Sequence, residues 1–477
     1  MGHPDDERSR LTRVPPQGAI VAVLAIAGLA SSFMFTLVVP IQAKLPELLH
    51  ASREDTAWVV TATLLAAAVI TPISGRLGDM YGKRRIVLVL LAVLVVGSVI
   101  AALSTDIVGV IIGRALQGAV TGVVPLGISI LRDVLHSDRV DSAIALISAT
   151  MGVGGALGMP LSALVTQYAD WHALFWMAAG MGAVVFALVL WIVPVSVLRT
   201  AGRFDYVGAA GLAAGLTGIL LAVSRGNEWG WTSPAVLACG LGGLAVLLVW
   251  GWYELRIAQP LLDLRVAARR PVLLTNIASM AMGFSLFSSN VSYPQLLELP
   301  APAGMGLTLL AASLVIAPAG LVMMVLSPYS GRLARTVGPR RLLVMGAIAL
   351  IVAYGFSLLW SDEVWHVLVA NLLVGVGIGF GYAAMPMLIM RSVPPSETGA
   401  SNGLNALFRS LGTSTAAAVI GAVLATFTTV QNGVNVPTHV AYDLSFVLGG
   451  AAAVIALVLA AFIPQRPTIE RHPSLPE

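Results

Sequence analysis

The sequence predicts an all-α integral membrane protein with fourteen membrane-spanning helices. Three observations predict this class: the apolar composition, the number and length of the apolar stretches, and the uneven distribution of basic residues between alternate loops. Of the 477 residues, 57% are hydrophobic and only 10% are charged, and the mean hydropathy is +0.89. A soluble domain typically carries about 25% charged residues. A chain this apolar therefore needs lipid around its helices.

The apolar stretches give the number of helices. A helix needs about 20 apolar residues to cross the ~30 Å hydrocarbon core, and the first stretch is too long for a signal-peptide core, so we expect it to be retained. The alternation of membrane β-barrel strands does not occur. We expect helices near residues 18–39, 55–75, 86–104, 107–130, 142–166, 171–193, 206–224, 233–253, 271–296, 306–328, 341–360, 366–390, 398–428 and 440–463.

The basic residues test this order and give its direction. With residues 1–17 in the cytoplasm, the cytoplasmic loops and tails hold 22 of the 27 lysines and arginines. The outer loops hold Lys44, Arg53 and Arg225, while Arg114 and Arg409 fall inside helices. This bias follows the positive-inside rule, so we expect both tails, 1–17 and 464–477, to be cytoplasmic. The richness in Ala, Gly and Arg with little Lys favours a bacterium, and hence a bacterial cytoplasmic (inner) membrane.

A repeated segment divides the chain. Residues 72–85 and 328–341 are identical at eight of fourteen positions, and each lies at the cytoplasmic end of one span and leads into the next. The copies are separated by eight spans, whereas a duplicated six-helix unit would separate them by six. We therefore expect a six-helix bundle over 18–194, two inserted helices over 205–253 and a second six-helix bundle over 271–463.

The first copy of the repeat carries a recognisable pattern. It resembles the loop signature between the second and third helices of the major facilitator superfamily, which implies the major facilitator fold. Its glycines allow a tight turn, and Asp79 can accept charge-assisted hydrogen bonds across the bundle interface as a conformational latch. The residues assigned to this gating role are Gly75, Asp79, Gly82, Lys83 and Arg84 in the first copy and Gly331 and Arg332 in the second.

Two further motifs fall inside spans. Arg114 and Gln117 match the superfamily's Arg-x-x-Gln-Gly signature, and a charged residue at membrane depth favours a function. A structural arginine satisfied by backbone carbonyls is the competing interpretation. Gly154, Gly158 and Pro160 resemble the Gly/Pro-rich antiporter signature of exporters, although Met159 splits its usual Gly-Pro pair. Ordinary packing of small residues is the competing interpretation there.

Several stretches resemble the fourteen-span drug:proton antiporters of this superfamily. Trp58-Val59-Val60-Thr61, Glu228-Trp229-Gly230-Trp231, Pro260-Leu261-Leu262-Asp263 and the segment from Asn405 to Arg409 carry this resemblance, which extends from about residue 18 to 463. The resemblance implies export of amphipathic small molecules by alternating access, driven by protons. One departure is large, because Met34 replaces the membrane-embedded Asp of the first span.

The missing aspartate bears on proton coupling. A buried carboxylate usually carries the proton because burial raises its pKa towards neutrality. None of the 23 acidic residues lies in the middle of an expected span. Three alternatives remain: Asp79 or Asp133 titrates near the cytoplasmic mouth with Arg114 modulating it, an acidic substrate carries its own proton, or the protein works as a facilitator.

The expected central cavity is electropositive, since it holds two arginines and no carboxylate. Neutral or anionic amphipaths therefore fit it better than organic dications. Arg114 and Arg409 supply the charge of the cavity, whereas Asp79 and Asp133 at the cytoplasmic ends of spans are the candidates for proton coupling. The other expected cavity residues are polar or aromatic: Ser31, Phe35, Thr36, Trp58, Thr61, Gln117, Asn276, Asn290, Tyr293, Asn371, Tyr382 and Asn405.

Other function classes have little support. A membrane enzyme needs a nucleophile–base pair or metal ligands at membrane depth, and no His–carboxylate pair is placed for this role. We expect no metal, no cofactor and no nucleic-acid partner, and a protein that works as a monomer in the lipid bilayer. The alternative within transport is a lipid or lipophilic-metabolite exporter with weak or no proton coupling.

Overall fold

The structure is a computed structural model that describes residues 16–38, 41, 45–195, 202–431 and 434–464. Fourteen helices in this part of the chain are long and apolar enough to cross a membrane, and each overlaps one expected span. The predicted all-α membrane fold is therefore confirmed. The expected tails 1–17 and 464–477 lie almost wholly outside the described residues.

The helices follow one another as simple spans, two of which are interrupted. Span four consists of α6 (Ile107–Gly118), the 3-10 turn η2 (Ala119–Gly122) and α7 (Val123–Val134), and span ten consists of α14 (Leu309–Ile316) and α15 (Pro318–Thr336). The other spans are α2 (Gln17–Thr36), α4 (Arg53–Tyr81), α5 (Lys83–Leu103), α8 (Ser137–Tyr168), α9 (His172–Ile192), α10 (Tyr206–Trp229), α11 (Pro234–Glu254), α13 (Arg270–Glu298), α16 (Pro339–Leu359), α17 (Val364–Met390), α18 (Thr398–Thr426) and α19 (His439–Phe462).

Short polar residues and glycines mark the helix ends. The side chains of Ser52, Asp106 and Asp205 each accept a backbone N–H from the first turn of the following helix, which satisfies a donor that the helix itself leaves unpaired. Gly82 and Gly338 occupy equivalent positions in the two repeat copies, with φ of 105° and 88°. Glycine adopts this region without steric penalty, so each copy can turn sharply into the next helix.

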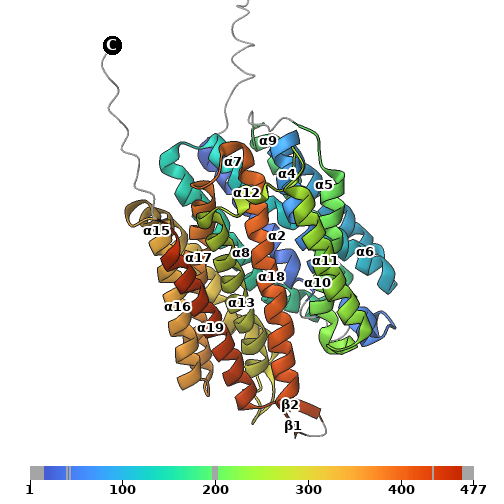
Figure 1. Ribbon diagram of the computed structural model, residues 1–477. Coiled ribbons are helices and arrows are strands. Elements are labelled where there is room, and N and C mark those ends of the chain that lie inside the picture. The colour runs from blue at the N-terminus through green and yellow to red at the C-terminus, as the bar shows by residue number, and fades with distance from the viewer. Residues whose placement is uncertain (1–15, 39–40, 42–44, 196–201, 432–433, 465–477) are drawn as a thin grey trace, which may run out of the picture.

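The two ends of the helical bundle differ (Figure 1). α2 begins and α19 ends at one end, at the top of Figure 1, which we name the terminal face. At the opposite face, β1 (Thr428–Gln431) pairs antiparallel with β2 (Val434–Pro437) between α18 and α19. Short helices α3 (Leu45–Leu48) and α12 (Leu264–Ala267) lie in connecting segments. The hairpin of β1 and β2 was not expected from the sequence, because its residues directly follow an apolar helix.

The inserted helices lie beside one of the two joins between the bundles. α10 and α11 pack along each other, and α10 also contacts α4 of the first bundle and α18 of the second. Leu212, Leu216 and Leu220 of α10 share an apolar cluster with Ala68 of α4 and Leu407 of α18. At the other join, between α8 and α15, the inserted helices α10 and α11 make no comparable contacts within the described residues.

The structure corrects two details of the sequence interpretation. Most of the repeated motif is helix rather than loop, since residues up to Tyr81 and Thr336 continue α4 and α15. Gly82 alone turns the chain in the first copy, and Val337 and Gly338 do so in the second. Arg225 does not stand in an outer loop, because α10 continues to Trp229 and buries it completely. Its guanidinium lies 4.4 Å from the ring centroid of Trp58 on α4 and pairs with Glu228.

Candidate functional site

Asp79 joins the two bundles at the terminal face. Its carboxylate accepts hydrogen bonds from the backbone N–H groups of Gly399 at 3.1 Å and Ala400 at 2.8 Å, in the first turn of α18. The residue that precedes this helix, Glu397, makes no capping bond with its side chain. Asp79 therefore caps α18 from the other half of the protein, and its charge complements the positive end of the helix dipole.

A lysine and a second carboxylate complete this cluster. Lys83 Nζ lies 2.7 Å from Asp133 Oδ2 and 3.9 Å from Asp79 Oδ1, and it donates to Thr398 Oγ1 at 3.3 Å. Lys83 and Asp79 are each only 1% exposed. The structure thus brings together both carboxylates that the sequence proposed as proton carriers. Buried charges of this kind are tolerated only when they are paired and hydrogen-bonded.

The second repeat copy makes the matching contact with opposite charge. Arg335 occupies the position of Asp79, and its guanidinium donates to the backbone carbonyl of Asp138 at the start of α8. Glycine allows the backbones to touch at both joins. A Cβ at Gly75 would overlap the Gly399 carbonyl, and one at Gly331 would overlap the Ser142 backbone. The repeat therefore closes the terminal face twice, once against α18 and once against α8.

The other residues assigned to gating have different surroundings. Arg84 donates to the carbonyl of Leu190 at the end of α9, so it ties α5 to α9 within one bundle. Arg332 is exposed. An ion pair of 3.0 Å between Arg391 and Asp141 adds a further link between the bundles.

The glycines of α8 serve close packing on α2. A Cβ at Gly154 would lie 2.6 Å from the Leu29 carbonyl, and one at Gly158 would overlap the hydroxyl of Thr36. Pro160 lies inside the same helix. These contacts fit the packing interpretation of this motif, within the first bundle.

Arg114 is held by backbone and amide oxygens. Its guanidinium donates to the carbonyls of Met34 at 2.9 Å and Val59 at 3.4 Å, and to Gln117 Oε1 at 2.8 Å. Gln117 in turn donates to Ser98 Oγ at 2.8 Å. Arg114 is 1% exposed, so in this conformation it ties α2, α4 and α6 together. These are the contacts of the competing interpretation, a structural arginine.

Arg409 has a different environment on α18. It is only partly buried, and its guanidinium lies 4.9 Å from the ring centroid of Tyr382 on α17. No hydrogen bond or ion pair joins this guanidinium to another residue in the part of the chain that the structure describes. One helical turn away, Asn405 donates to Asn276 Oδ1 at 3.0 Å and to Ser279 Oγ at 2.6 Å. Arg409, Asn405, Asn276 and Ser279 thus form a polar cluster in the second bundle. The guanidinium of Arg409 is the cation of this cluster, and it is available to a ligand.

The remaining expected cavity residues divide by exposure. Tyr293 is buried, hydrogen-bonded to Ser357 Oγ at 2.9 Å and packed against Phe446, so it lies inside the second bundle rather than between the bundles. Ser31, Thr61 and Asn371 are also buried, and each donates to a backbone carbonyl. Side chains that keep some exposed surface are Phe35, Thr36, Trp58 and Asn290.

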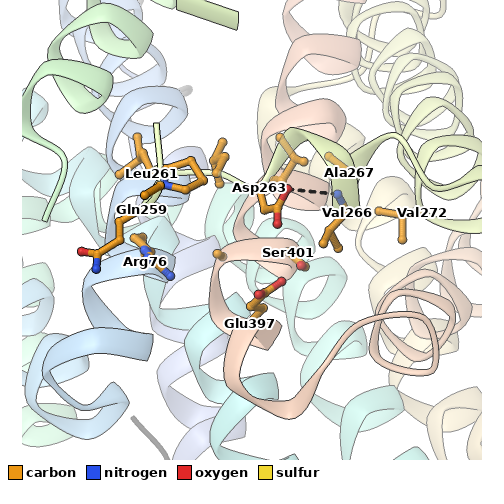
Figure 2. A pocket seen from close by; sticks show the side chains of 14 residues that line it. Arg76, Gln259, Leu261, Asp263, Val266, Ala267, Val272, Glu397 and Ser401 are labelled. Atoms are coloured by element: carbon orange, nitrogen blue, oxygen red, sulfur yellow. Dashed lines mark hydrogen bonds between the residues drawn. The ribbon is translucent and has the colours of Figure 1, made fainter. Parts of the chain in front are cut away.

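One cavity was missed by the sequence reasoning. It has a volume of about 220 Å³ and lies at the terminal face between α4, α18 and the segment that connects α11 to α13. Figure 2 shows Arg76 and Gln259 on one side, with Asp263 above Ser401 and Glu397. The carboxylate of Asp263 already has protein partners, because it accepts hydrogen bonds from the backbone N–H groups of Arg265 and Val266. The signal in the sequence was the stretch 260–263, which carries part of the family resemblance and lines this cavity.

Known proteins resemble this chain over most of its length. The family model described as Major Facilitator Superfamily matches residues 24–205 and 204–417. The lincomycin resistance protein LmrB of Listeria monocytogenes is 26% identical, with 93% of this chain and 96% of that protein covered. The cephamycin export protein CmcT of Amycolatopsis lactamdurans is 31% identical, with 87% and 85% covered. The tetracenomycin C resistance and export protein of Streptomyces glaucescens is 26% identical, with 88% and 79% covered.

Two solved structures share the fold. The human organic anion transporter MFSD10 gives a TM-score of 0.66 at 15% identity and covers 94% of this chain and 100% of that one. The proton:xylose symporter XylE gives a TM-score of 0.64 at 13% identity and covers 94% and 96%. At these identities the likeness concerns the arrangement of helices alone.

Proposed function

The chain belongs to the Major Facilitator Superfamily, and from this premise we propose that it is a secondary transporter that exports small amphipathic drugs or antibiotics from a bacterial cytoplasm. The observation that carries this proposal is the length of the similarity to three proteins named for antibiotic resistance or export. These matches extend across both bundles and the inserted helices. Catalysis plays no part in the proposal.

Alternating access gives the contacts at the terminal face a role. The bias of basic residues supports a cytoplasmic terminal face in the bacterial inner membrane, so the conformation in hand is closed towards the cytoplasm. Asp79 stabilises this state by capping α18, and Arg335 does so at the start of α8. Opening towards the cytoplasm must break both contacts. A substrate shifts the equilibrium only by the difference in its affinity for the two states.

The charge of the substrate follows from the polar cluster around Arg409. Its guanidinium lies over the ring of Tyr382, and Asn405, one turn away on α18, donates to Asn276 of α13. Arginine recognises carboxylates and phosphates through its planar fork of donors, and an aromatic ring suits the apolar part of an amphipath. We therefore favour neutral or anionic amphipaths over organic cations.

We infer that any proton coupling does not use span one. The Met34 side chain is fully buried and cannot titrate. Asp79, Asp133 and Lys83 form a buried cluster at the closed face, where opening would expose them to water. This cluster is the route that we favour within the protein, and a proton carried by an acidic substrate is the alternative.

Accumulation of compounds in bacterial cells tests the export proposal. A susceptible bacterial host that lacks its own efflux pumps is made to express the wild-type chain or the Asp79→Asn variant at equal membrane levels. Accumulation of acidic, neutral and cationic amphipaths is then measured. Lower accumulation of acidic or neutral compounds in wild-type cells supports the proposal. Accumulation that equals that of an empty host for every compound contradicts it.

The second candidate is a lipid or lipophilic-metabolite transporter with weak or no proton coupling, and the buried Met34 favours it. The two candidates differ in proton flux. In proteoliposomes, a drug antiporter given a neutral substrate moves protons in a fixed ratio to substrate. A facilitator moves the same substrate down its gradient without proton flux.

A further inference from the structure

A surface groove runs beside the join between α8 and α15. Its walls come from Val21 and Ala22 of α2, Leu146 of α8 and Met324 of α15, and its volume is about 560 Å³. The rim at the terminal face carries Arg139, Asp138 and Arg335. We name this feature the lateral groove. It lies at the join that the inserted helices leave uncovered.

The lateral groove changes from polar to apolar with depth. Arg139 precedes Leu146 by seven residues, and Met324 precedes Arg335 by eleven, so the apolar wall reaches about 10–16 Å below the arginines at 1.5 Å per helical residue. Both arginines lie near helix ends that mark the membrane boundary. A phospholipid has this profile, with a charged headgroup at the boundary and acyl chains below it.

The rim also has the right charge. Arg139 is exposed, and no hydrogen bond or ion pair joins its guanidinium to any residue within the described ranges. One Nη of Arg335 is used by the Asp138 carbonyl. With the Asp138 carboxylate included, the rim carries one net positive charge, and the first N–H groups of α8 add to it. Basic side chains at this level attract anionic lipid headgroups.

We propose that the lateral groove binds one anionic phospholipid, with the headgroup phosphate between Arg139 and Arg335 and an acyl chain along Val21, Leu146 and Met324. The site contains helices of both bundles, since α2 and α8 belong to the first and α15 to the second. Separation of α8 from α15 would divide it. The lipid therefore binds the closed terminal face more tightly and shifts the protein towards that state.

Lipid binding to the purified full-length chain tests this proposal without any substrate. Protein in nanodiscs of phosphatidylcholine receives increasing fractions of phosphatidylglycerol, and the Tm and the lipid adducts in native mass spectra are recorded. We expect a saturable rise in Tm and one retained phosphatidylglycerol. Arg139→Gln should weaken this binding about tenfold, the loss of one charge-assisted contact. Arg270→Gln removes an exposed arginine at the same face that does not line the lateral groove, and it should bind like wild type.

A second variant keeps the proposal testable if charge removal disturbs the fold. Ala22→Phe fills the apolar wall at an exposed position and changes no charge. It should raise the off-rate of the lipid while the Tm in pure phosphatidylcholine stays at the wild-type value. Equal stabilisation by both lipids, or wild-type adducts in Arg139→Gln and Ala22→Phe, would overturn the proposal and leave only ordinary surrounding lipid.

Discussion

At the scale of single residues, Asp79 combines three properties that rarely occur together. It is charged, it is almost fully buried, and both of its backbone partners belong to the other half of the chain. Such a carboxylate contributes to the fold only while the terminal face is closed. Its removal should therefore change the balance between conformations more than the stability of either bundle.

We predict that Asp79→Asn slows transport while folding stays intact. Asparagine can still accept an N–H from α18, but the charge that complements the helix end and Lys83 is lost. A loss of about 1.4 kcal/mol would shift the population tenfold towards the state open at the terminal face. Transport rate per folded molecule and Tm, measured on the same preparation, check this. A wild-type rate in a well-expressed variant would contradict the latch.

Arg409 and Arg114 should respond differently to the same substitution. Arg409→Gln should reduce transport of an acidic substrate more than that of a neutral one, because no carboxylate among the described residues pairs with its guanidinium, which lies over Tyr382. Arg114→Gln leaves the carbonyls of Met34 and Val59 without their donor. It should therefore lower the Tm and reduce the transport of the acidic and the neutral substrate equally. Equal losses for both substrates in Arg409→Gln would assign a structural role to it as well.

At the scale of elements, two glycines allow α4 to touch α18 and α15 to touch α8. We predict that Gly75→Val and Gly331→Val each abolish most transport, because the added side chain meets backbone atoms that cannot move aside. Gly180→Val is the matched control, since a Cβ there meets nothing within 4 Å. Substrate accumulation in cells with equal amounts of each variant measures the effect. Full activity in both interface variants would show that this close approach is not required.

The sequence predicted the spans well and their surroundings poorly, for physical reasons. Apolar length alone locates a span, so all fourteen helices were found. Their ends were missed where polar residues remain helical because another helix supplies their partners. The carboxylate of Asp79 binds backbone N–H groups of α18, and the guanidinium of Arg225 lies over the ring of Trp58 on α4. The repeat located Asp79, but the residues that its carboxylate binds lie more than 300 positions away. Hydropathy carries no information about such partners.

At the scale of the whole molecule, the proposed alternating access requires the terminal face to open. Cys239 is the single cysteine, so Cys239→Ser gives a background for paired labels. We predict that joining Asp141→Cys to Arg391→Cys with a short reversible bifunctional thiosulfonate stops transport, and that a reductant restores it. These positions form an ion pair between the bundles. Joining Arg340→Cys to Ala461→Cys, both within the second bundle, should leave transport unchanged. Continued transport through the first cross-link would contradict alternating access at this face.

The cap that Asp79 places on α18 also makes two backbone amides into reporters of the transport cycle. While the terminal face is closed, the N–H groups of Gly399 and Ala400 are bonded to a buried carboxylate, so their hydrogens should exchange slowly with deuterium. Once the face opens, the first turn of α18 loses its acceptor and frays, and both hydrogens should exchange quickly. Peptides that cover residues 395–404 would then follow the cycle by mass alone, in unlabelled wild-type protein. Exchange that stays the same when conditions favour the other conformation would show that α18 finds another cap.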